Sequence, residues 1–89
     1  MSSITGYHAH VYYDAPQRDA AQRLCETVRD RFGIAMGRLH DQAVGPHPRG
    51  SCQLSVTPEN FSGVIQWLVA NRGGFTIFAH ALSGDEIKD

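Results

Sequence analysis

Apolar and polar residues alternate in three short stretches of the chain, as they do in half-buried β-strands. These stretches cover residues 7–13, 51–56 and 75–81. Residues 34–39 form a weaker candidate for a strand, because Gly37 interrupts the alternation. The sequence therefore predicts four strands.

Two other stretches carry apolar residues at helical spacing. The first follows Asp14 as a helix N-cap and ends at Gly33, and its stripe is Ala21, Leu24, Cys25, Val28 and Phe32. The second follows Thr57 as a cap and ends at Gly73, and its stripe is Phe61, Val64, Ile65 and Leu68. Capping residues and terminal glycines are the usual signals of helix ends. Two helices are predicted, with a Pro/Gly-rich loop over residues 41–50.

The resulting order is β-α-β-β-α-β over a single domain of residues 1–89, which predicts an α+β, ferredoxin-like fold. We expect one four-stranded antiparallel sheet with both helices on one face and the strand order 4-1-3-2. This order makes the first strand an antiparallel neighbour of the last.

Side chains alternate across a strand, so one set packs under the helices and the other faces away. The set expected on the uncovered face is His8, His10, Tyr12, Gln53, Ser55, Phe78 and His80. Directly opposed Cβ atoms of antiparallel strands lie about 5 Å apart. The pair His8 and His10 can therefore converge with His80 on one metal ion. The competing interpretation is a solvated sheet face with incidental histidines.

Other polar residues also have two interpretations. His47 lies between two prolines, in a stiff loop that either positions a catalytic group or only closes a turn. His40 is followed by Asp41, as in a His–carboxylate pair or the start of a loop. Tyr12 is a candidate substrate contact or an interface residue, and Arg38 a candidate partner for a substrate carboxylate or a solvated side chain.

An uncovered, partly aromatic sheet face is unfavourable on so small a domain. Two copies stacked face to face would cover it and enclose a cavity. We therefore predict a homodimer, of the dimeric α+β barrel type.

Composition narrows the functional classes. The chain has 89 residues and a formal net charge of −1, and it has no basic run, which argues against nucleic-acid binding. No apolar stretch reaches the roughly 20 residues of a membrane span, and the N-terminus does not resemble a signal peptide. A cytoplasmic location is expected, where Cys25 and Cys52 would be free thiols and not a disulfide.

Several motifs together resemble the DOPA 4,5-dioxygenase family. They are YHAHVYYD at 7–14, GRLHD at 37–41, VGPHP at 44–48, WLVANR at 67–72, and His80 with the Gly-Asp pair at 84–85. They occur in order and span residues 7–85. The paired histidines and the Gly-Pro-His-Pro motif carry most of the specificity.

The resemblance implies a ferredoxin-like, usually dimeric protein that uses non-haem iron(II) and O2 for extradiol cleavage of a catechol such as L-DOPA. The family's motif histidines correspond to His8, His10, His47 and His80. We expect all four on the metal side, with His10 and His47 as the catalytic candidates and His47 acting either as a ligand or in acid/base catalysis. Tyr12, Arg38 and His40 are the expected substrate contacts. An all-histidine ligand set and a carboxylate supplied by a partner both remain open.

Two other functional classes share this element order. A cofactor-independent dimeric α+β barrel monooxygenase would need no convergent histidines. A non-enzymatic module would bind aromatic ligands without consuming oxygen. The density of histidines favours the dioxygenase over both.

Overall fold

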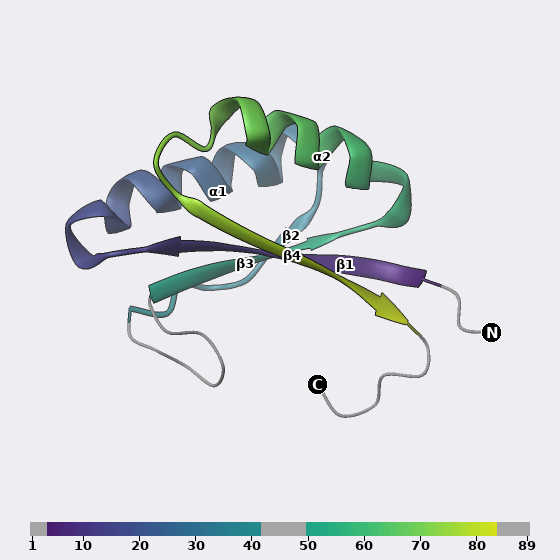
Figure 1. Ribbon diagram of the computed structural model, residues 1–89, viewed down its shortest axis with the longest axis horizontal. Coiled ribbons are helices and arrows are strands. Elements are labelled where there is room, and N and C mark those ends of the chain that lie inside the picture. The colour runs from purple at the N-terminus through teal and green to yellow at the C-terminus, as the bar shows by residue number, and fades with distance from the viewer. Residues whose placement is uncertain (1–3, 42–49, 84–89) are drawn as a thin grey trace.

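Four antiparallel strands form one twisted sheet, and both helices lie on the same face of it (Figure 1). The computed structural model describes residues 4–41 and 50–83. The strands are β1 (Ile4–Tyr13), β2 (Ala35–Met36), β3 (Gly50–Val56) and β4 (Thr76–Ser83). Their order in the sheet is β2-β3-β1-β4, which confirms the predicted order 4-1-3-2.

Two strands differ from their predicted length by three residues or more. The strand β1 begins at Ile4, three residues earlier than its alternation indicated, and β2 shrinks to two residues. Pairing at this edge resumes at His40, whose N–H and carbonyl both bond to Ser51, at 2.9 and 2.8 Å. Gly37 lies between these two pairings and donates to the carbonyl of Gln53 at 2.8 Å. The glycine therefore marks an irregular edge, as the broken alternation suggested.

The helix α1 (Arg18–Phe32) follows a short 3-10 turn, Ala15–Gln17. Asp14 precedes this turn in an extended conformation, and its N–H donates to the side chain of Gln17 at 3.4 Å. The helix ends at Gly33, which adopts φ 64°, a left-handed conformation that a residue without Cβ adopts at little cost.

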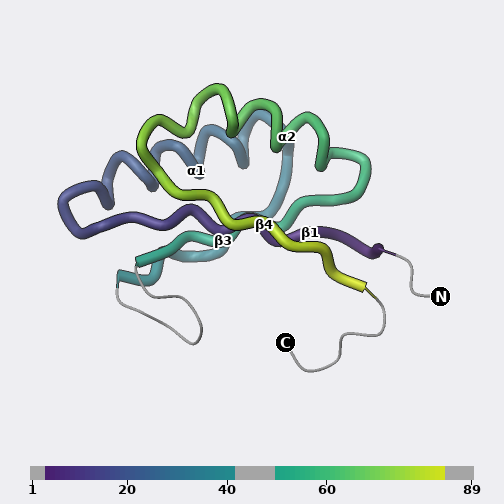
Figure 2. Tube along the Cα trace, viewed as in Figure 1, coloured from purple at the N-terminus to yellow at the C-terminus, as the bar shows by residue number. Residues whose placement is uncertain are grey.

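The helix α2 (Pro58–Asn71) begins with the predicted cap. The hydroxyl of Thr57 accepts a hydrogen bond from the N–H of Asn60 at 3.2 Å, and Pro58 occupies the first helical position. The two helices run side by side over the sheet (Figure 2). No helix among residues 4–41 and 50–83 has the length and hydropathy needed to cross a lipid bilayer.

The core lies between the helices and the sheet and contains the predicted apolar stripes except Ile65. Its buried members are Ala9, Val11, Tyr13, Ala21, Cys25, Val28, Ile34, Cys52, Leu54, Val56, Val64 and Leu68. Tyr7 extends this core by stacking on Phe61 of α2, with ring centroids 3.8 Å apart. Both cysteines are free and buried, as predicted. The sheet face away from the helices, called the open face below, carries the candidate chemistry.

Candidate metal centre

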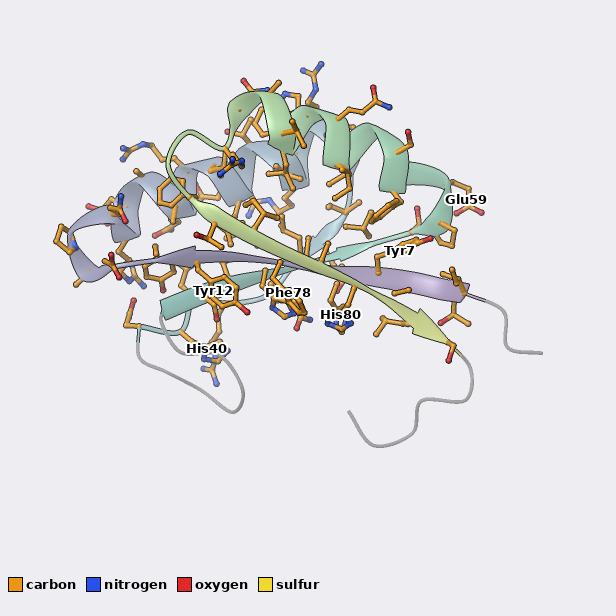
Figure 3. The ribbon with its side chains drawn as sticks, viewed as in Figure 1. Tyr7, Tyr12, His40, Glu59, Phe78 and His80 are labelled. Carbon is orange, nitrogen blue, oxygen red and sulfur yellow. The ribbon has the colours of Figure 1, made fainter. Side chains whose placement is uncertain are left out.

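Three histidines occupy adjacent positions on the open face. In the pairing of β1 with β4, His8 lies directly opposite His80. His10, the next residue of β1 on the same face, lies opposite Phe78. Side chains two residues apart on a strand share a face, so the register directs all three imidazoles to the same side. Figure 3 shows His80 below the sheet, away from the helices, as the sequence predicted.

The imidazoles are close enough to form one site. Each ring offers a nitrogen such that these atoms all lie within 4.8 Å of one another. The Nε2 atoms of His10 and His80 are 3.4 Å apart, and these two rings are nearly parallel, with an interplanar angle of 14°. His8 meets the ring of His80 edge-on, with centroids 5.5 Å apart.

The donor set fits a first-row divalent metal. Imidazole nitrogens bind such ions at about 2.1 Å, so two of them on one ion lie at most about 4.2 Å apart. The separation of 3.4 Å between His10 and His80 is already within this limit. The other distances between the ligand nitrogens are at most 4.8 Å, and a small rotation of one ring would bring them within the same limit. His8, His10 and His80 can therefore provide three ligands and leave further coordination positions for other groups.

Aromatic side chains enclose the His10 side of this cluster. The ring of His10 lies 6.0 Å from the ring of Phe78 and 6.4 Å from that of Tyr12, close to parallel with both. His10 is only 4% exposed, although it faces away from the helices. Burial also raises the pKa of the Tyr12 phenol. Tyr12 thus stays protonated and able to donate a hydrogen bond at neutral pH.

The other expected substrate contacts lie farther along the sheet. His40 is exposed and pairs with Ser51, which in turn lies opposite Tyr12 on the next strand. Arg38 is exposed on the segment after β2. The structure therefore separates Arg38 and His40 from the three histidines by at least one strand. His47 lies outside the described residues.

The carboxylate of Asp41 takes part in a network that sequence reasoning did not identify. It accepts hydrogen bonds from the phenol of Tyr13, at 3.1 Å, and from the guanidinium of Arg18. The bond from Arg18 lowers the pKa of Asp41, and burial together with the bond to Asp41 raises the pKa of Tyr13 to about 12. A buried tyrosine needs a hydrogen-bond partner for its hydroxyl. The position of Tyr13 at the end of a strand could therefore have indicated a polar partner nearby. Asp41 is engaged here, so the suggested pairing of Asp41 with His40 is not the main role of this carboxylate.

A hollow of about 410 Å³ adjoins the other side of the cluster, where His8 forms part of its wall. Its lining includes small residues of the open face, namely Gly6, Ala35 and Ser55, together with larger ones such as Leu82. Another hollow of about 420 Å³ lies between α2 and β4, and none of the three histidines lines it. Of these two hollows, the one beside His8 therefore adjoins the candidate metal centre.

The chain is similar to proteins named as dioxygenases. It is 33% identical to a DOPA 4,5-dioxygenase from Amanita muscaria over 99% of its own length and 42% of that protein. It is also 33% identical to an uncharacterised 21.2 kDa protein from Botryotinia fuckeliana, over 96% of this chain and 50% of that protein. The chain thus spans about half the length of these curated relatives.

A solved structure shows the same fold. The crystal structure of a dioxygenase candidate from Nostoc punctiforme superposes with a TM-score of 0.87 at 45% sequence identity. The match covers 92% of this chain and 71% of that one. The model of the Dopa 4,5-dioxygenase family matches residues 7–89, and the chain belongs to that family.

Proposed function

We propose that the protein is a non-haem iron(II) extradiol dioxygenase that cleaves the ring of a catechol with O2. The observation that carries this proposal is the convergence of three imidazoles, with ligand atoms within 4.8 Å, on the open face of the sheet. Membership of the family supports the dioxygenase class. The three imidazole donors fit a first-row divalent metal, and iron(II) is one of these.

His8, His10 and His80 would hold the ion from two strands that are hydrogen-bonded to each other, so the scaffold is rigid. What iron(II) supplies in such a site is a set of neighbouring open positions for the catechol oxygens and for O2. Because three neutral imidazoles would leave the double positive charge of the ion uncompensated, the site would favour a catechol that binds as an anion.

The remaining residues would orient the substrate and move protons. The phenol of Tyr12, which is protonated at neutral pH and has its pKa raised further by burial, is proposed to donate a hydrogen bond to the substrate on the open face. His47 is proposed for proton transfer, because a histidine outside the metal ligands can exchange protons near neutral pH. Arg38 and His40 are proposed as contacts for the side of the catechol ring that points away from His8.

We further propose that two copies pair through their open faces. Phe78 is 50% exposed on this face although it is a large apolar residue. Pairing about a two-fold axis would cover Phe78 and exclude water from the metal centre. A closed, water-poor cavity strengthens the electrostatic interactions within it.

Reconstitution with iron(II) under anaerobic conditions tests the function. After oxygen is admitted, the loaded protein should consume O2 with a panel of catechols and form a yellow ring-opened semialdehyde with strong visible absorption. A chelator should abolish this activity. Oxygen uptake that survives the chelator would indicate the cofactor-independent monooxygenase, and binding of catechols without any oxygen uptake would indicate a binding module.

A further inference from the structure

Small side chains on the open face create the hollow beside His8. Across the sheet, Ala35 lies opposite Ser55, Ser55 opposite His8, and His8 opposite His80. The next residue on the same face toward the start of β1 is Gly6, which has no side chain. Ser55 lies on the strand next to that of His8, and neighbouring strands are about 4.8 Å apart. The space over Ser55 and Gly6 therefore lies directly beside the imidazole of His8.

The opposite side of the metal centre is bordered by aromatic rings of the described residues. There the rings of Tyr12 and Phe78 lie 6.4 and 6.0 Å from the ring of His10, which is 4% exposed. A catechol bound at the three histidines therefore has room for a ring substituent on the side of His8. The volume of about 410 Å³ lies within the range of roughly 300–1,000 Å³ found for small-molecule sites.

The described residues that line the hollow carry no formal charge. Leu82 supplies apolar surface, and Thr5, Ser55 and Thr57 carry hydroxyl groups. Ile34 and Val56 border the hollow although their side chains are buried in the core. Of the described residues that line it, none is Asp, Glu, Lys or Arg. The positive end of α2 begins beyond Thr57, but Glu59 in the first turn already offsets it. A charged substituent placed here would lose water without gaining a counter-charge from the described lining residues, which is costly.

We propose that this hollow receives the ring substituent of the catechol and selects an uncharged one, such as a short alkyl or hydroxyalkyl group. The inference rests on the proposed function and specifies its substrate class. A catechol whose substituent carries a carboxylate, with or without an ammonium group, is disfavoured. Ser55 and Ala35 are then specificity-determining residues, although neither contacts the metal ion.

Equilibrium binding without oxygen provides the test. Dissociation constants of catechol, 4-ethylcatechol and 3,4-dihydroxyphenylacetate are measured by calorimetry on the iron(II)-loaded protein under anaerobic conditions. In the wild-type protein, 4-ethylcatechol should bind more tightly than catechol. It should also bind at least about tenfold more tightly than 3,4-dihydroxyphenylacetate, because a group that does not suit its pocket weakens binding by about tenfold or more.

Substitutions in the hollow make the test specific. Ser55→Leu fills the space next to His8 and should weaken 4-ethylcatechol about tenfold while catechol is unchanged; Ser55→Ala is the matched control that leaves the space open. Ala35→Leu, at an exposed position, repeats the filling test without touching a neighbour of the ligands. Ala35→Arg adds a cation at the rim and should shift the preference toward 3,4-dihydroxyphenylacetate.

The outcomes separate this inference from the proposed function. If the loaded wild-type protein binds catechol but both filling variants keep the wild-type ratio for 4-ethylcatechol over catechol, the hollow is not the substituent site. If the wild-type protein prefers the carboxylate, the selection for uncharged groups is wrong. If the wild-type protein binds no catechol and consumes no oxygen with any catechol of the panel, the proposed function itself fails, and the inference fails with it.

Discussion

The phenol of Tyr13 donates a hydrogen bond of 2.8 Å to the main-chain carbonyl of His40, and so joins the end of β1 to the edge segment that pairs with β3. The same hydroxyl bonds to Asp41. Tyr13→Phe keeps the buried ring and removes only these bonds. Because the carbonyl of His40 retains its bond from Ser51, we expect a loss of about 1 kcal/mol in unfolding free energy. The melting temperature should fall by about 4–8 °C.

The same variant should change the alkaline limit of stability. The folded protein raises the pKa of Tyr13 from 10.0 to about 12, so it holds this proton more tightly than the unfolded chain. This contribution is fully present below pH 10 and is lost as the pH rises through about 12. Urea unfolding at pH 9, 10, 11 and 12 should show a steeper decline for the wild-type protein than for Tyr13→Phe. Parallel declines would contradict the assignment.

Any side chain at Gly50 is predicted to lower the stability of the fold, because the ring of Tyr13 lies over this residue. A Cβ at this position would meet Cε1 of Tyr13 at 2.7 Å and the carbonyl oxygen of His40 at 3.0 Å. Both neighbours are fixed by packing and hydrogen bonds, so Gly50→Ala should cost about 1–3 kcal/mol. Gly74→Ala is the matched control, since a Cβ there meets nothing within 4 Å. Equal melting temperatures for the two variants would show that the ring of Tyr13 moves freely.

Metal content distinguishes ligands from bystanders among the histidines. His10→Ala and His80→Ala should each abolish stoichiometric iron uptake while the fold is kept, because each removes one of three converging nitrogens. His40→Ala should bind iron normally, since His40 lies on the far edge of the sheet. The measurement is metal per subunit after desalting. Normal uptake in both His10→Ala and His80→Ala would refute the site.

His47→Ala separates two roles for the loop histidine. If His47 transfers protons, the variant should keep its iron and lose at least about 100-fold in turnover, the usual contribution of a general acid or base. The measurements are iron per subunit and the rate of oxygen uptake with the same catechol. Equal loss of iron and of turnover would instead make His47 a fourth ligand.

Much of this architecture could be predicted from the sequence, because periodicity reports directly which side chains share a face. The alternation around His8 and His10, together with the strand order expected of β-α-β-β-α-β, was sufficient to bring His80 opposite His8. The helix ends at Gly33 and Thr57 followed from local chemistry that does not depend on the rest of the fold.

Features that depend on contacts between distant segments could not be read in this way. The bonds from Tyr13 and Arg18 to Asp41 join residues 28 and 23 positions apart, and no local pattern marks them. The hollow beside His8 depends on the register that aligns Gly6, Ser55 and Ala35, three unremarkable small residues in the sequence. The burial of His10 depends on rings from two strands closing around it.

Pairing through the open face can be tested at Phe78. This ring is 50% exposed beside the metal centre, and a two-fold axis through the open face would bring the two copies of it close together. Phe78→Arg would then place like charges in a desolvated interface and should give monomers at concentrations where the wild-type protein is dimeric. Val69→Arg is the matched control, because Val69 is 68% exposed on α2, on the other side of the sheet. Light scattering coupled to size-exclusion chromatography measures the masses. Dissociation by Val69→Arg but not by Phe78→Arg would place the interface on the helices instead.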